Sequence, residues 1–144
     1  QKKKNTNYYK VIKIINNKFF FKFNYLDCFK QKNYKLLIKK CLALIPSPNI
    51  SILGIGDDGH IGSIFPGKFY GEKKLYVVKR TGERFKRITI SENEILKSNF
   101  IVFFVNSKKK SSMIMKIIKG EKNLKIPFFR ICQNFKRKIY IFYY

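Results

Sequence analysis

Residues Gly54–Gly67 read Gly-Ile-Gly-Asp-Asp-Gly-His-Ile-Gly-Ser-Ile-Phe-Pro-Gly, a glycine-rich loop with two of the chain's eight acidic residues and its only histidine, His60. The loop follows Ile50–Leu53, a short apolar run typical of a buried parallel strand. Open α/β sheets bind their ligands at the carboxyl ends of such strands. The glycine-rich loop is therefore the first candidate for a functional site.

Helix and strand patterns alternate on both sides of this loop. Apolar residues at spacings of three and four predict a helix from Tyr34 to Ile45, which Pro46 ends. Two apolar runs within Tyr8–Phe23 indicate a hairpin or two short strands. Later strands are predicted at Leu75–Lys79, Arg87–Ser91, Phe100–Val105 and Ile139–Tyr143. This order of elements indicates the α/β class, with a sheet covered on both faces.

Two more helices are predicted between these strands. Ser91 is typical of an N-cap, and acidic residues follow it in the first turn of a helix over Glu92–Ser98. A second helix is predicted over Lys108–Lys119, ended by Gly120. The residues of this helix that are expected to face inward are Met113, Ile114, Ile117 and Ile118.

Length and composition indicate one folded domain. A chain of 144 residues with 45% hydrophobic residues is long and apolar enough to form a core. Its three cysteines, Cys28, Cys41 and Cys132, lack the C-x-x-C spacing of a zinc site or a disulfide framework, which favours a reducing, cytoplasmic location. No apolar run approaches the roughly 20 residues of a membrane span. Because the chain begins with Gln1 rather than Met, we expect a truncated or processed start.

The net charge of +24 indicates either an anionic partner or a compositional bias. Only 5 of the 32 cationic side chains are arginines, the residue best suited to phosphate and base recognition. The lysines are scattered and rise together with Asn, Ile, Phe and Tyr, a set that AT-rich codons favour. We therefore favour solvated lysines over a nucleic-acid surface. An inactive basic protein that binds nucleic acid remains the non-enzymatic alternative.

The glycine spacing also matches a dinucleotide-binding fingerprint, through Gly54, Gly56 and Gly59. We reject this reading because Pro66-Gly67 ends the run within two turns, where a dinucleotide site needs a long helix aimed at the pyrophosphate. The two neighbouring aspartates would moreover repel the phosphates. The loop therefore predicts a different chemistry.

Asp58 and His60 are separated by a single glycine, so a turn can bring the carboxylate to the imidazole. A carboxylate that fixes one ring nitrogen leaves the other nitrogen free to act as a base near neutral pH. The alternative is an Asx-type turn with a surface histidine that bonds only its own loop. The spacing leaves both readings open.

The glycine-rich loop resembles the signature loop of the 6-phosphogluconolactonases, in a sugar-phosphate isomerase-like superfamily shared with glucosamine-6-phosphate deaminase. Arg87–Ser91 resembles the family's arginine-initiated strand, and Phe100–Lys110 resembles its apolar strand leading into a lysine-bearing turn. Ile126-Pro127 is similar to the family's proline ahead of the final strand. The resemblance extends from about Tyr34 to Tyr144.

This resemblance implies a three-layer sandwich with a mainly parallel sheet. It also implies hydrolysis of 6-phospho-D-glucono-1,5-lactone to 6-phosphogluconate, a step of the oxidative pentose phosphate pathway, without metal or cofactor. His60 would be the general base and Asp58 would orient it. The implied substrate-binding residues are Gly56 and Gly59, through amides that stabilise an oxyanion, and Arg87 and Lys110, near the anionic substrate. The alternative for Arg87 and Lys110 is that each is a solvated surface cation that does not bind the substrate.

Two departures from the family pattern shape the expectations. Deaminases carry a catalytic glutamate five residues after the loop histidine, where this chain has Phe65, so we favour the lactonase over the deaminase. Family members also begin with an α/β portion containing a phosphate-binding Gly/Ser loop, but residues 1–33 contain no glycine. We expect 1–33 to be a poorly matched basic segment and 34–144 to be the C-terminal part of an incomplete lactonase-like domain. Either this is a fragment, fused to or associated with glucose-6-phosphate dehydrogenase, or a decayed family member.

Overall fold

The computed structural model describes residues 33–44, 46–84 and 86–143, in two compact units that we treat separately, residues 1–44 and 45–144. In the first unit it describes helix α2 (Tyr34–Leu44), which confirms the predicted helix before the proline break. The side chain of Asn33 starts the helix by accepting a hydrogen bond from the Lys35 amide at 3.0 Å. The strands predicted within Tyr8–Phe23 lie outside the described residues.

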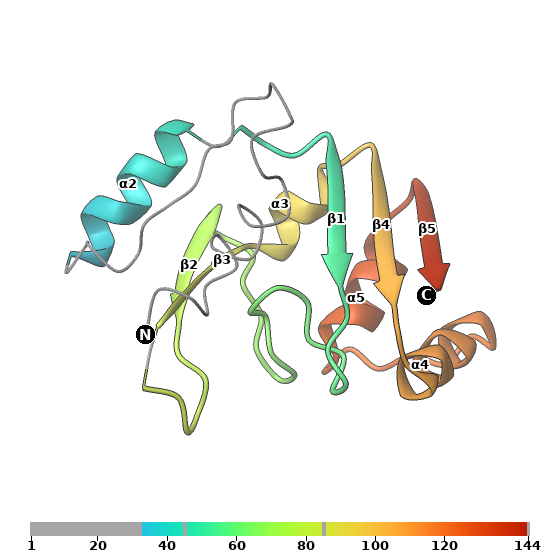
Figure 1. Ribbon diagram of the computed structural model, residues 1–144. Coiled ribbons are helices and arrows are strands. Elements are labelled where there is room, and N and C mark those ends of the chain that lie inside the picture. Colours follow the sequence, from blue (N-terminus) through green and yellow to red (C-terminus); the bar gives the residue numbers. More distant parts are fainter. Residues whose placement is uncertain (1–32, 45, 85, 144) are drawn as a thin grey trace, which may run out of the picture. The chain divides into compact units, whose positions relative to one another are not determined.

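The second unit is built on a parallel sheet of three strands, β1 (Ile50–Gly54), β4 (Phe100–Val105) and β5 (Lys138–Tyr143). They lie in the order β1-β4-β5 and point the same way (Figure 1). Each of them was predicted from its apolar run, and together they confirm an α/β fold with a parallel sheet. The loops that follow β1 and β4 therefore leave the same edge of the sheet.

A separate antiparallel pair consists of β2 (Leu75–Val78) and β3 (Arg87–Ile90). Both strands were predicted. The connection between them starts with a tight turn, in which the Glu83 amide donates to the Arg80 carbonyl oxygen at 3.1 Å. Gly82 adopts a φ of 82° in this turn, a conformation that favours glycine. The turn fixes the backbone positions of Arg80 and Glu83, from which their side chains extend.

Three helices complete the unit: α3 (Glu92–Leu96), α4 (Lys108–Ile118) and α5 (Pro127–Asn134). Ser91 caps α3 as predicted, its hydroxyl oxygen accepting from the Glu94 amide at 3.2 Å. In α4, Ile114 is buried, but the prediction that Ile118 faces inward is wrong. Ile118 is 69% exposed because it occupies the last helical position, on the solvent side. No described helix is both long and apolar enough to span a membrane.

Helix α5 is the element that the sequence reading missed, and it lies behind the sheet (Figure 1). Its Phe128 ring meets the Phe103 ring of β4 edge to face, with centroids 5.0 Å apart. One hydrophobic core joins this face of the sheet to the helices and to the glycine-rich loop. Its buried members are Ile55, Ile61, Ile64, Ile95, Ile101, Phe103, Val105, Ile114, Phe128, Phe129, Ile131 and Phe135.

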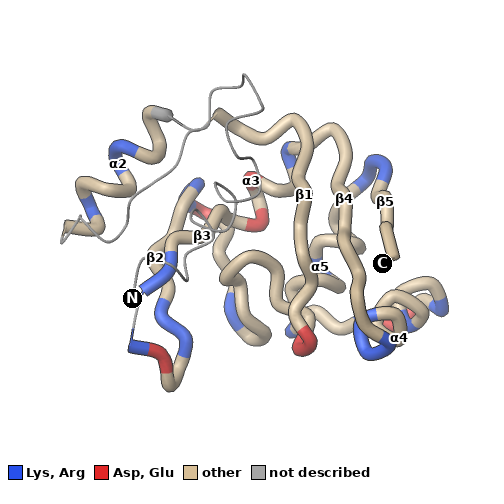
Figure 2. Tube along the Cα trace, viewed as in Figure 1, with Lys and Arg blue, Asp and Glu red and all other residues tan. Residues whose placement is uncertain are grey.

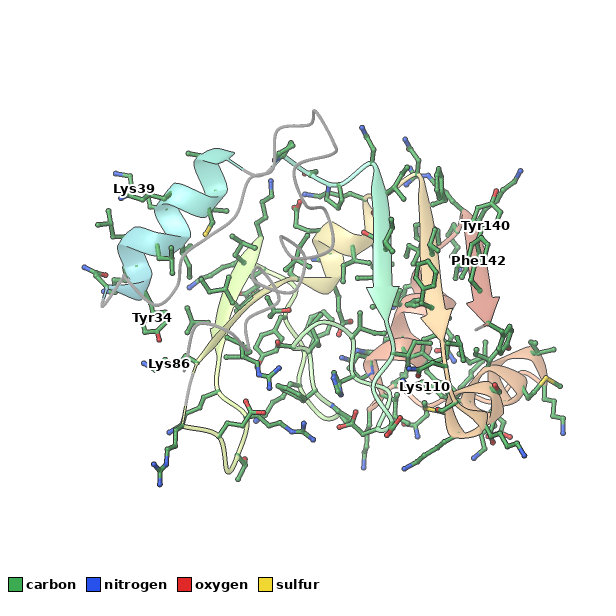
Figure 3. The ribbon with its side chains drawn as sticks, in the orientation of Figure 1. Tyr34, Lys39, Lys86, Lys110, Tyr140 and Phe142 are labelled. Atoms are coloured by element: carbon green, nitrogen blue, oxygen red, sulfur yellow. The ribbon has the colours of Figure 1, made fainter. Side chains whose placement is uncertain are left out.

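The opposite face of the sheet is apolar but exposed. Alternation along the strands places Ile52, Phe104 and Phe142 on this face. The Phe104 and Phe142 rings stack on each other with centroids 5.7 Å apart. Figure 3 labels Phe142 together with Tyr140, which lies two residues earlier on β5 and shares its face. Within the described part of the chain, the core of this unit thus lies on the α5 side of the sheet.

Candidate active site

The glycine-rich loop is anchored in the core by three isoleucines. Ile55, Ile61 and Ile64 are buried and pair with one another through short antiparallel bridges. The amides of Ile61 and Ile64 each donate to the other residue's carbonyl oxygen, at 3.2 Å and 2.9 Å. Because these residues point inward, the segment between Ile55 and Ile61 is pushed outward as a tight, acidic tip.

Helix α5 braces this tip from behind. The Phe128 amide, in the first turn of α5, donates to the Gly59 carbonyl oxygen at 3.1 Å. Gly59 has a φ of 79°, and a Cβ placed there would overlap the side chain of Ile126. Both features require glycine at this position. The loop and the helix therefore fit together only when residue 59 has no side chain.

Asp58 and His60 form the central pair of the site. His60 Nδ1 lies 2.5 Å from Asp58 Oδ1, and the His60 amide also donates to that oxygen at 3.1 Å. Partial burial raises the pKa of the Asp58 carboxyl, but the His60 hydrogen bonds and charge outweigh this, so the pKa lies below its ordinary value of 3.8. Since an ionised carboxylate only accepts, the hydrogen belongs to Nδ1. The turn thus brings the two side chains together as their spacing predicts.

The imidazole stays accessible from one side. The His60 side chain is 26% exposed, and the Asp58 side chain is 41% exposed. It borders an open depression of about 300 Å³, which Gly56 and Gly62 also line. The imidazole lies so close to Gly56 that a Cβ at that position would overlap ring atoms. The His60 ring can therefore occupy this position beside the depression only because residue 56 is glycine.

The amides of the two predicted substrate-binding glycines are already used inside the loop. The Gly56 amide donates to the His60 carbonyl oxygen, and the Gly59 amide donates to the Gly56 carbonyl oxygen, both at 2.9 Å. In this arrangement both N–H groups donate to carbonyl oxygens of the loop, so stabilising an oxyanion would require them to exchange these bonds. Their observed contribution is to shape the loop. Direct binding of substrate by either glycine stays a prediction.

The two predicted cations lie in different surroundings. Lys110, labelled in Figure 3, lies in the first turn of α4, where its Nζ donates to Asn106 Oδ1 at 2.6 Å and approaches Asp57 Oδ1 at 3.9 Å. Arg87 donates from Nε and Nη2 to the two carboxylate oxygens of Glu83, at 2.9 Å and 2.6 Å. Lys110 therefore borders the acidic tip, whereas Arg87 is engaged by an acid of its own.

A cation that the sequence reading missed lies beside the central pair. Arg80 Nη2 approaches Asp58 Oδ2 at 3.8 Å, and the guanidinium lies 5.2 Å from the ring centroid of Phe65. The Phe65 ring is in turn 5.2 Å from the His60 ring. The only available signal was the presence of two arginines, Arg80 and Arg84, between two strands. Figure 2 shows the acidic tip below β1 and the basic residues of the neighbouring segments.

The acidic side chains of the glycine-rich loop approach cations in the part of the chain that the structure describes. No group of three or more His, Cys, Asp or Glu side chains lies close enough together there to hold an ion. The loop acids face cations instead, at 3.8 Å for Asp58 and Arg80 and at 3.9 Å for Asp57 and Lys110. The chemistry that the described residues themselves offer is that of an imidazole oriented by a carboxylate.

The sequence of this chain matches a known protein family. The model of the glucosamine-6-phosphate isomerases/6-phosphogluconolactonase family matches residues 12–140. This chain belongs to that family. A 6-phosphogluconolactonase of Helicobacter pylori strain J99 is 29% identical over 100 residues, which are 67% of this chain and 44% of the relative. The chain thus spans about half the length of the curated relatives it matches.

Solved structures of the family share the fold. A 6-phosphogluconolactonase from Leishmania guyanensis superimposes with a TM-score of 0.61 and 20% identity, over 76% of this chain and 48% of that one. A monomeric glucosamine-6-phosphate deaminase gives a TM-score of 0.63 and 21% identity, over 78% and 54%. At these identities the likeness shows the fold alone. Since the same fold is found in a lactonase and in a deaminase, the site must distinguish between the two activities.

Proposed function

We propose that this chain carries the catalytic loop of a 6-phosphogluconolactonase, which hydrolyses the ester of 6-phospho-D-glucono-1,5-lactone. The observation that carries the proposal is the 2.5 Å approach of His60 Nδ1 to Asp58 Oδ1 at the edge of an open depression. The names of the curated relatives support the same reaction. Its place in the oxidative pentose phosphate pathway and a cytoplasmic location belong to the proposal and stay predictions.

The proposed mechanism uses the two nitrogens of His60 for different tasks. Nδ1 donates its hydrogen to Asp58, so the neutral ring has an unprotonated Nε2. Nε2 takes a proton from a water molecule, whose oxygen then attacks the lactone carbonyl carbon. When the tetrahedral intermediate collapses, the ring C–O bond breaks, and the imidazolium returns the proton to the departing oxygen. The product is the open-chain acid, which ionises near neutral pH.

Asp58 is proposed to act through His60 rather than on the substrate. Its carboxylate fixes the orientation of the ring and stabilises the imidazolium that forms during the reaction. The lowered pKa of Asp58 supports this role, since it keeps the carboxyl ionised near neutral pH. Asp58 is therefore a positioning residue in this mechanism.

Phe65 favours the lactonase over the deaminase. Its ring is in contact range of the imidazole, with centroids 5.2 Å apart, and it offers no group that can carry a proton. Opening a sugar ring and moving protons between its carbons needs an additional acid or base, whereas ester hydrolysis by water does not. We therefore expect the chain to release no ammonia from glucosamine-6-phosphate.

The direct test compares the full chain with its His60→Ala variant in hydrolysis of the phosphorylated lactone. We expect the variant to lose about 10²- to 10⁴-fold in rate, the usual contribution of a general base. Circular dichroism and thermal unfolding of the variant should match those of the parent, because the imidazole lies outside the core. Full activity in the variant would remove His60 from the mechanism.

A further inference from the structure

We propose that Arg80 binds the phosphate group of the substrate, an assignment that rests on the proposed function for the identity of that substrate. The first support is position. Arg80 begins the turn after β2, and that turn is closed by the Glu83 amide bond to the Arg80 carbonyl oxygen. Its guanidinium reaches Asp58 Oδ2 at 3.8 Å, whereas the other oxygen of Asp58 is held by His60. Arg80 and His60, the proposed base, thus approach the same carboxylate, that of Asp58.

The guanidinium of Arg80 retains its capacity to bind. The side chain is 48% exposed, and its guanidinium donates no hydrogen bond to any residue within the described ranges. The Phe65 ring beneath it limits where the guanidinium can lie. An arginine that lies against a ring, is about half exposed and approaches its carboxylate only at 3.8 Å suits bidentate binding of a phosphate.

Arg87 differs from Arg80 in this respect. Its Nε and Nη2 are both donated to Glu83, and this bond, acting against partial burial, helps to hold the pKa of Glu83 below its ordinary value of 4.5. A phosphate at Arg87 would have to compete with that carboxylate. Arg80 faces Asp58 across 3.8 Å, too long for a direct hydrogen bond, so an incoming phosphate displaces less.

The geometry also separates Arg80 from the reacting atoms. Nδ1 of His60 contacts Asp58 Oδ1, whereas Arg80 approaches the other carboxylate oxygen, Oδ2. Nε2, the proposed base, belongs to the opposite edge of the imidazole. The guanidinium therefore suits a part of the substrate that does not react, as the phosphate is. It is less suited to the carbonyl oxygen, where negative charge develops in the transition state.

Charge balance at the acidic tip supports an anionic substrate. Asp57 and Asp58 would repel a phosphate if they were unopposed, but Lys110 approaches the first at 3.9 Å and Arg80 approaches the second at 3.8 Å. Removing Arg80 would leave one of these acids without its nearby cation. We therefore expect the loss of Arg80 to weaken binding of phosphorylated compounds more than the loss of another exposed arginine.

The first experiment measures binding without relying on catalysis. The full chain is titrated with 6-phosphogluconate, and the NMR signals of His60, the only histidine, report occupancy. We expect Arg80→Gln to raise the Kd about tenfold, as for loss of charge-assisted hydrogen bonds. Arg84→Gln is the matched control, because Arg84 is exposed and lies on the same connection between β2 and β3. It removes the same charge, and we expect it to change the Kd by less than about twofold.

Two results of this titration would overturn the assignment. One is an equal rise in the Kd for Arg80→Gln and Arg84→Gln. Binding would then depend on the general attraction of an anion to a chain with net charge +24 and not on Arg80. The other is the absence of 6-phosphogluconate binding by the parent chain. Arg80→Lys sharpens the positive result, because it keeps the charge but loses the planar fork and should give an intermediate Kd.

The second experiment separates this assignment from the proposed function. For hydrolysis of the phosphorylated lactone, Arg80→Gln should raise KM with little change in kcat, and the rise in KM should be clearly larger than for unphosphorylated glucono-1,5-lactone, which has no phosphate to bind. An equal fall in kcat for both lactones would contradict a phosphate contact. If the parent binds 6-phosphogluconate through Arg80 but hydrolyses neither lactone, the assignment is supported and the lactonase proposal fails.

Discussion

The inner and outer sides of the glycine-rich loop use charge in opposite ways. On the inner side, Arg130 of α5 and Glu92 of α3 form a buried ion pair, with Nε of Arg130 3.0 Å from Glu92 Oε2. The guanidinium also donates to the carbonyl oxygens of Leu124 and Lys68, each at 2.6 Å. Every nitrogen of this side chain has a partner, so the pair ties two helices and the end of the loop together.

On the outer side, the Asp58 and His60 pair is only partly satisfied. One oxygen of Asp58 accepts from His60, the other faces Arg80 at 3.8 Å, and the imidazole borders an open depression. The difference teaches that a saturated, buried pair fixes structure, whereas an exposed pair with unused capacity is able to bind and react. The loop needs both pairs, because the inner pair holds the loop in place and thereby fixes the position of the outer pair.

The largest effect should come from breaking the inner pair. Arg130→Met leaves the Glu92 carboxylate buried without its partner, which typically costs about 3 to 5 kcal/mol in the free energy of unfolding. Urea unfolding followed by circular dichroism measures the loss. Adding Glu92→Met should restore much of the stability, since it removes the unpaired charge. If Arg130→Met unfolds like the parent chain, the inner pair does not hold the loop.

The inner pair also shows where sequence reading reached its limit. Ser91 and the acids after it were read as a helix N-cap with charges that suit the helix dipole, and the cap is confirmed. Glu92, however, is buried against Arg130, 38 residues further along the chain. A pairing over that distance depends on how α3 and α5 pack, which no local pattern encodes.

Helix α5 itself left a signal that was overlooked. Phe128, Ile131 and Phe135 are buried at spacings of three and four, and Pro127 occupies the first turn, where proline is tolerated. The strands β1 and β4 were easier to predict, because continuous apolar runs need no register to be recognised. Arg80 could not be predicted as part of the site, since it meets Asp58 only after β2 and β3 have paired.

A smaller effect should follow from disturbing the outer pair without changing any charge. In Gly56→Ala the new methyl group would overlap the imidazole, so His60 must rotate out of its place beside the depression. We expect hydrolysis of the phosphorylated lactone to fall by about 10- to 100-fold, because misplacement of a catalytic group by about 1 Å can cost that much. Thermal unfolding should change little, since a partly exposed ring can move into solvent.

Gly54→Ala provides the matched control for this prediction. Gly54 does not adopt a positive φ, and no atom lies within 4 Å of a Cβ added there. This variant should retain most of the activity and the same thermal unfolding as the parent. Equal losses from the two alanine variants would show that the loop tolerates no methyl group at all, and that contact with His60 is not the reason Gly56 is needed.

The most direct measurement of the central claim is the tautomer of His60. Because the chain has a single histidine, a two-bond ¹H–¹⁵N spectrum recorded above the pH at which the ring loses its charge reports this residue alone. We predict that the hydrogen is on Nδ1 and that Nε2 is bare, with the preference lost in Asp58→Ala. A spectrum of the parent chain with the hydrogen on Nε2 would contradict the claim that Asp58 holds His60 ready to act as a base.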